Sequence, residues 1–257
     1  MPDALLRVTG LSKRFGGIVA TDNLSFEVRQ GELHAMIGPN GAGKTTLIAQ
    51  LSGQLIPNAG TINFDGIDIT RVPAYRRSHL GLARSFQITS LFLDLSVLDN
   101  VALAVQAHAG HSFRFWSNAR RIPELRDPAR EALRRVGLEH RAEARTSLLS
   151  HGEHRLVELA MALAGKPRML LLDEPMAGLG PDESARMVAM LAALKREYTI
   201  LLVEHDMEAV FALADRITVL VYGRVIASGS PAEIRANPEV REAYLGEDDV
   251  AEGAAYV

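Results

Sequence analysis

The fold is decided by the stretch LHAMIGPNGAGKTT at residues 33–46. Its first five residues are mostly apolar and predict a short buried strand, and spaced apolar residues predict a helix over 46–55. The turn between them fits the pattern G-x-x-x-x-G-K-[ST], and its position between strand and helix favours a phosphate-binding loop over a chance glycine-rich turn. This loop consists of Gly38, Pro39, Asn40, Gly41, Ala42, Gly43, Lys44 and Thr45, with Thr46 directly after it as a further candidate contact.

The chemistry of such a loop explains its residue types. Glycines let successive backbone N–H groups turn toward one phosphate, and the start of the helix adds partial positive charge. Lys44 would bring a full charge to the β- and γ-phosphates, and the Thr45 hydroxyl would ligate Mg²⁺. The loop therefore predicts a site for a nucleoside triphosphate with its magnesium ion.

A second segment, MLLLDE at residues 169–174, would complete the chemistry. A carboxylate at the end of a buried strand can hold Mg²⁺ through water, and we expect this of Asp173. Glu174 stands one residue further out, where a carboxylate can orient and partly deprotonate the attacking water. An apolar strand that ends in Asp-Glu is common by itself, and the upstream phosphate loop is what favours the catalytic interpretation.

Composition excludes several classes of protein. The 257 residues are 47% hydrophobic and 23% charged, which is typical of a globular chain. Without cysteine there are no disulfides, thiolate catalysis or cysteine metal sites, and a net charge of −3 argues against nucleic acid as a partner. No apolar run approaches the ~18–20 residues of a membrane span, and we expect no signal peptide. The sequence predicts a soluble cytoplasmic protein that reaches a membrane only by docking on other subunits.

The rest of the chain predicts an α/β fold. Short strands are expected at 5–8, 24–28, 33–37, 60–64 and 67–69. Helical periodicity dominates from about 90 to 165. Strands then alternate with helices, which implies a parallel sheet with crossover helices: strand 169–172, helix 182–196, strand 200–203, helix 207–214 and strand 217–222.

An arginine-rich segment lies within the helical region. Five acids oppose its nine arginines, and the surplus fits either a solvated helical face or a docking surface. The arginines are Arg114, Arg120, Arg121, Arg126, Arg130, Arg134, Arg135, Arg141 and Arg145.

The segment LSHGE at residues 149–153 indicates the family. Ser150 and Glu153 have capping-box spacing, which by itself predicts only a well-capped helix. Between the phosphate loop and the Asp173 strand, however, the segment resembles the signature loop of ATP-binding cassette (ABC) ATPases, whose usual form is LSGGQ. The resemblance implies that Ser150 and Gly152 contact nucleotide. His151 and Glu153 depart from the usual form, and we expect the Glu153 carboxylate to turn back to its own helix cap.

Further positions match the same family. Phe15 corresponds to the aromatic residue that stacks on adenine, and Gln87 to the Q-loop glutamine that senses Mg²⁺ and water and opens the helical subdomain. His205 corresponds to the switch histidine at the γ-phosphate, where a neutral imidazole can donate a hydrogen bond. Residues 177–180 correspond to the D-loop, but Gly180 stands where an aspartate is usual.

Several segments resemble the branched-chain amino-acid importer ATPases in particular: 15–20, 83–87, 150–154, 172–179, 203–207 and 243–246. ATPases of urea importers and of lipopolysaccharide export share several of these features and stay open as alternatives. A soluble single-cassette ATPase is a third. Repair and chromosome cassettes do not fit, because only 105 residues separate Thr45 from Ser150 and no heptads are sustained. Glu174 disfavours a regulator without turnover.

The resemblance implies a P-loop (RecA-like) core at 1–86 and 159–235 with an antiparallel β-subdomain, an inserted helical subdomain at 87–158 and a C-terminal tail at 236–257. ATP and Mg²⁺ are the implied cofactors. The implied partners are two transmembrane permease subunits, a second ATPase subunit and, indirectly, a periplasmic or extracellular solute-binding protein. The second cassette is identical or a sister subunit, the commoner case in the family. The chain is then expected at the cytoplasmic face of the inner (plasma) membrane, peripherally bound.

Overall fold

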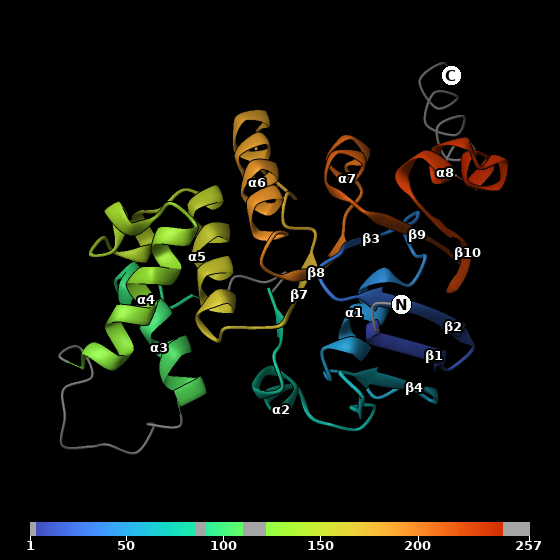
Figure 1. Cartoon of the computed structure of the whole chain (residues 1–257), viewed down its shortest axis with the longest axis horizontal. Helices are drawn as coiled ribbons and strands as arrows, with labels where there is room; N and C mark the ends of the chain where they lie inside the picture. Colours follow the sequence, from blue (N-terminus) through green and yellow to red (C-terminus); the bar gives the residue numbers. More distant parts are fainter. Residues whose placement is uncertain (1–3, 86–90, 110–121, 244–257) are drawn as a thin grey trace. The chain divides into compact units, whose positions relative to one another are not determined.

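The computed structural model describes residues 4–85, 91–109 and 122–243 (Figure 1). The chain divides into two compact units. The first comprises the chain up to residue 74 together with the part from residue 192 onward, and the second comprises residues 75–191. Each unit is described by itself.

The first unit contains an antiparallel sheet of four strands: β1 (Ala4–Phe15), β2 (Ile18–Arg29), β4 (Ala59–Phe64) and β5 (Ile67–Asp68), in the order β2-β1-β4-β5. Its first two strands form a hairpin, and β1 also pairs with β4. The side chains of Val8, Leu24, Phe26 and Val28 are buried while their neighbours are exposed, as the two-residue period of a half-buried strand requires.

Strands β3 (Leu33–Ile37), β8 (Thr199–Val203), β9 (Arg216–Val221) and β10 (Arg224–Gly229) also belong to the first unit. β3 pairs in parallel with β8 and β9, and β10 folds back antiparallel on β9. Every residue of β3 and β8 is buried, which explains why both strands are apolar runs without alternation. The helices of this unit are α1 (Lys44–Leu51), α7 (Met207–Leu213) and α8 (Pro231–Ala236).

The second unit is mainly helical. It holds α3 (Val97–Ala109), α4 (Pro123–Arg135), α5 (His151–Ala164) and most of α2 (Ala74–His79) and α6 (Pro181–Leu194). Its described residues also form short 3₁₀ helices at Glu139–Arg141 and Thr146–Leu148. Helices α3, α4 and α5 pack on one another. Val97, Val101 and Val105 recur at four-residue spacing and form the buried stripe of α3. Two parallel strands, β6 (Leu82–Arg84) and β7 (Met169–Asp173), complete the unit.

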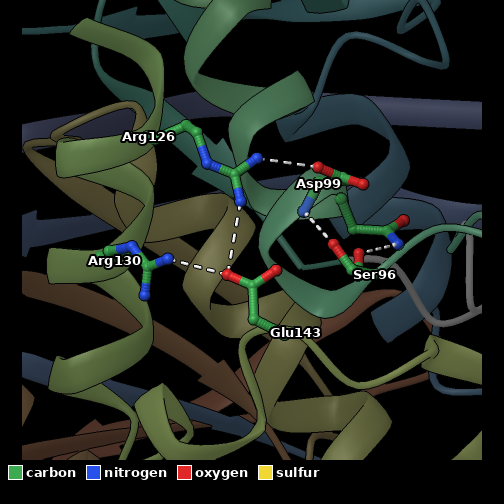
Figure 2. A network of polar contacts seen from close by, with 6 residues as sticks. Ser96, Asp99, Arg126, Arg130 and Glu143 are labelled. Carbon is green, nitrogen blue, oxygen red and sulfur yellow. Dashed lines mark hydrogen bonds and ion pairs between the residues drawn. The ribbon is translucent and has the colours of Figure 1, made fainter. Parts of the chain in front are cut away.

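Carboxylates of the same unit pair with the arginines of α4 (Figure 2). Arg126 donates to Asp99 of α3 at 3.0 Å and to Glu143 at 3.4 Å, and Arg130 donates to Glu143 at 2.8 Å. Arg134 forms further ion pairs with Glu131 and Glu139, and Arg135 forms one with Glu131. For this part of the arginine-rich segment the pairs favour a solvated face whose charges are balanced locally. Arg114, Arg120 and Arg121 lie outside the described residues.

The predicted α/β class is confirmed, and the strand predicted at 33–37 has those bounds. The hairpin strands are longer than predicted, and β6, β10, α2 and α8 were not anticipated. The predicted division into core, helical subdomain and tail stays a prediction. Across the described parts of the chain, none of the helices combines the length and the apolar character that crossing a bilayer requires.

Candidate nucleotide-binding site

The phosphate loop connects β3 to α1, as predicted. At two of its positions only glycine fits, because backbone atoms of other segments leave no room for a Cβ. A Cβ on Gly38 would lie 2.1 Å from the carbonyl oxygen of Leu220, and one on Gly43 would lie 2.2 Å from that of Ala20. Gly43 also has φ of +100°, a conformation that side chains disfavour. Any larger residue at either position would displace the loop.

Lys44 opens helix α1 with its side chain folded over the loop. The ammonium group is buried and donates to the carbonyl oxygen of Gly38 and, at 3.0 Å, to that of Pro39. Thr45 beside it is exposed. The loop therefore gathers backbone N–H groups, one cation and an accessible hydroxyl, which is the set of groups that a triphosphate requires.

Phe15 ends β1 next to the hairpin turn. The residue is 49% exposed, and the Lys13 ammonium lies 5.5 Å from the centroid of its ring. A flat aromatic face open to solvent can stack on a base, which is the role predicted from the sequence.

His205 follows β8, and its backbone is fixed by its neighbour. The fully buried carboxylate of Glu204 accepts from the backbone N–H of His205 at 3.0 Å and of Asp206 at 3.4 Å. The Asp206 side chain caps α7 by accepting from Ala209 N–H. The imidazole itself is 64% exposed, so a rigid backbone presents an accessible ring.

In the second unit, Asp173 is the last residue of β7 and is buried. Its Oδ2 accepts from Arg84 Nη2 at 3.0 Å, and both side chains are nearly removed from solvent. Glu174 comes next with φ of +49°, in the left-handed region. A non-glycine residue costs about 1–2 kcal/mol there, and such strained residues gather at functional sites.

The signature-like segment begins helix α5 with a complete capping box. Ser150 Oγ accepts from the Glu153 backbone N–H at 3.2 Å, and Glu153 accepts from the Ser150 N–H at 2.8 Å. Arg141 lies 3.1 Å from the other Glu153 oxygen. The expectation that Glu153 turns back to its own cap is confirmed.

The predicted residues thus fall into two groups. Phe15, the phosphate loop and His205 belong to the first unit, and Asp173, Glu174, Ser150 and Gly152 to the second. Gln87 lies outside the described residues.

Sequence reasoning missed three residues in contact with these groups: Arg84, Glu183 and Glu204. Glu183 belongs to no recognised sequence motif. It does stand three residues after Gly180, which precedes a helix, and this is the spacing of a capping box. Arg84 and Glu204 are charges at the ends of apolar strands, and no pattern in the sequence reveals their partners.

Family models match most of the chain. The ABC transporter model matches residues 21–177, and a model described as branched-chain amino acid ATP-binding cassette transporter matches residues 224–250.

Individual relatives agree with the family models. The chain is 40% identical to the high-affinity branched-chain amino acid transport ATP-binding protein LivG of Salmonella typhimurium, over 96% of this chain and 100% of the relative. It is 38% identical to BraF of Pseudomonas aeruginosa, a protein of the same description, with the same coverage.

Among solved structures, an ABC-transporter cassette in its ADP conformation is similar with a TM-score of 0.84 and 30% identity, covering 95% of this chain and 99% of that one. A nucleotide-free cassette gives 0.83 and 29%, covering 94% and 99%. These similarities extend over nearly the whole length of both proteins, so the chain belongs to the ABC transporter family as one of its ATP-hydrolysing, ATP-binding cassettes.

Proposed function

We propose that the chain is the ATPase subunit of an importer for branched-chain amino acids. The observation that carries this proposal is the match at residues 224–250 to the branched-chain cassette model, together with relatives of that description over almost the full length. The segment from 224 onward includes β10 and α8 and lies apart in sequence from the ATP motifs, so this match does not depend on the motifs that ATP-binding cassettes share.

The residues of the phosphate loop would bind ATP. Lys44 and the N–H groups from Gly38 to Thr46 neutralise the β- and γ-phosphates, and Phe15 stacks on adenine. Thr45, Asp173 and Gln87 offer hydroxyl, carboxylate and amide oxygens, which is the donor set that Mg²⁺ prefers. The buried position of the Asp173 carboxylate at the end of a parallel strand fits this use. Bound Mg²⁺ would supply positive charge at the β- and γ-oxygens.

Glu174 and His205 would carry the hydrolytic step. The Glu174 carboxylate orients the attacking water and accepts its proton, and the His205 imidazole donates to the γ-phosphate. Lys44 holds the charge that develops on the transferred group. The exposed His205 ring on a fixed backbone suits a group that must meet a phosphate only when nucleotide is present.

The names of the relatives and the family pattern support the proposed partners. Two permease subunits would hold the chain at the cytoplasmic face of the membrane, with a solute-binding protein acting outside. A second cassette, sister or identical, would present its phosphate loop to Ser150 and Gly152 of this chain. ATP would then favour the closed pair of cassettes over the open pair and so drive the permease between two states.

The test is transport in a strain that lacks the gene for this chain. Uptake of labelled leucine, isoleucine and valine should be lost and should return with the wild-type chain. The Glu174→Gln chain, expressed to the same level, should not restore it. If leucine uptake stays intact in the deletion strain while urea uptake is lost, the proposed solute is wrong.

A further inference from the structure

The carboxylate of Glu183 lies against the start of the signature helix α5. Its Oε1 accepts from the Ser150 hydroxyl at 3.4 Å, and its Oε2 accepts from the Gly180 backbone N–H at 3.4 Å. A Cβ on Gly152 would lie only 2.6 Å from the same Oε1, so the carboxylate packs directly on this glycine. All four residues belong to the second unit. One side chain therefore bridges the signature loop and the D-loop.

The cause is visible in the sequence around residue 180. Gly180 precedes α6, and its carbonyl accepts the first helical hydrogen bond, from Ser184 N–H at 2.9 Å. An aspartate at this position, usual in the family, would cap the helix with its own side chain. Glycine has no side chain, and Glu183 reaches back to the Gly180 N–H instead, as the third residue of a capping box does. This reach brings its carboxylate beside Ser150.

The contact is incompatible with binding of a phosphate at the same place. The Ser150 hydroxyl has one proton, which it donates to Glu183, while its oxygen accepts from the Glu153 N–H. It cannot give that proton to a γ-phosphate oxygen at the same time. A carboxylate packed on Gly152 would also repel an incoming phosphate.

We propose that Glu183 is a positioning residue that holds Ser150 away from nucleotide, and that ATP-driven pairing of two cassettes requires Glu183 to release it. The inference rests on the proposed role of Ser150 and Gly152 at the partner's γ-phosphate. Since the same carboxylate holds the Gly180 N–H, its release frees the D-loop together with the signature loop.

The experiment measures pairing in the Glu174→Gln background with Mg²⁺ and ATP, by sedimentation of the chain alone and by crosslinking in the purified transporter. Adding Glu183→Gln should lower the ATP concentration for half-maximal pairing about fivefold, because a neutral amide holds the serine more weakly than a carboxylate does. Asp182→Asn is the matched control: it removes the same charge from the adjacent, exposed residue and should change nothing. With Ser150→Ala, the difference in ATP requirement between the two forms of residue 183 should be smaller, because only the repulsion between the carboxylate and the phosphate remains.

An unchanged or raised ATP requirement in the Glu183→Gln variant overturns the inference. Failure of the Glu174→Gln protein to pair at any ATP concentration, alone and in the transporter, contradicts the shared nucleotide site instead. In that case, chemical denaturation of the isolated chain tests whether Glu183 and Ser150 interact. Glu183→Gln should shift the midpoint when Ser150 is present and shift it less in the Ser150→Ala background. Equal shifts in the two backgrounds would show that residues 150 and 183 do not interact.

Discussion

At the scale of single residues, Glu174 combines a functional position with an unfavourable backbone. It follows the buried strand β7 and has φ of +49°. Strain of this kind persists only where the surrounding structure fixes the conformation, and it places the side chain at an angle that a regular strand end would not give. The conformation therefore fits the proposed catalytic role, and it can be separated experimentally from that role.

Two truncations of Glu174 separate strain from chemistry. Glu174→Gly should be more stable than Glu174→Ala by about 1 kcal/mol, because glycine adopts the left-handed region without a Cβ penalty. Both should lose turnover, because neither has a base. Urea denaturation gives the stability difference and phosphate release the rate. An alanine variant as stable as the glycine variant would show that no strain is stored there.

Glu158 should make the stability of the fold depend on pH, through a group outside the candidate nucleotide-binding site. Burial raises the pKa of this carboxyl above its ordinary value, against the opposing effects of Arg155 and His154. Within the described structure its Oε1 has no hydrogen-bond partner. The folded state therefore holds the proton more tightly than the unfolded state, and stability falls as pH rises from the unfolded pKa through the folded one.

Glu158→Gln should remove that fall in stability. The amide oxygen can still accept from Arg155, whose Nη1 lies 3.3 Å from Oε2, and no charge has to be buried. We expect the variant to exceed the wild type at pH 8 by on the order of 1 kcal/mol and to match it near pH 4. Denaturation curves across this range provide the measurement. If the stability of the wild type relative to the variant rises from pH 4 to pH 8, the pKa of Glu158 is not raised in the folded state.

At the scale of elements, Asn100 holds α3 to the segment before the signature helix. It is fully buried, and its amide nitrogen lies 3.0 Å from the carbonyl oxygens of Phe92 and Ser96 and from the Thr146 hydroxyl, three acceptors that share its two protons. Its oxygen accepts from the Phe92 N–H at 2.8 Å. One side chain thus satisfies groups from three parts of the chain.

Asn100→Asp should lower the free energy of unfolding by about 2–4 kcal/mol, because a carboxylate keeps the acceptor but loses the donors and leaves a buried charge facing carbonyls. Gln106→Ala, on the partly exposed side of the same helix, serves as the control and should cost much less. Chemical denaturation measures both. Equal losses would mean that Asn100 is no more than an ordinary helix residue.

The elements also show what the sequence could predict. Buried parallel strands such as β3, β7 and β8 are recognisable in the sequence because they are short apolar runs. Each is followed by a loop that carries predicted nucleotide-binding or catalytic residues. β6 has three residues, and β10 reads RVIASG without alternation, so neither has a periodic signal. The loop motifs placed Lys44, Asp173 and Ser150 correctly at element ends. The contacts Arg84–Asp173 and Glu183–Ser150 join residues 89 and 33 positions apart, and tertiary packing alone brings them together.

At the scale of the whole molecule, the chain alone should be a poor ATPase until a second cassette supplies a signature loop. Ser150→Arg should stop turnover at the partner's site while leaving ATP binding to its own Lys44 and Phe15 intact. Lys44→Ala should prevent turnover at the site formed by its own phosphate loop. Each should lower turnover roughly 10²–10³-fold, and a mixture of the two should regain activity, because a mixed pair has one site with both loops intact. A sister subunit would replace one variant in this assay.

The activity of the mixture is the result that decides between mechanisms. If neither the mixture nor a sister subunit exceeds the rate of dilute single chains, each chain completes its own site and the shared arrangement is wrong. The same concentration series on the wild type provides the reference, since a shared site makes the rate per chain rise with protein concentration.

The Lys44 ammonium donates to the carbonyl oxygens of Gly38 and Pro39. These two hydrogen bonds bear on how ADP and phosphate would leave the proposed site. When nucleotide leaves, the lysine does not face an empty space, because its own loop offers replacement acceptors at once. In the proposed site the loop would therefore compete with the phosphates for the same cation and would weaken the binding of ADP. In the proposed ATPase cycle, weaker binding of ADP would speed its release, at some expense of affinity for nucleotide.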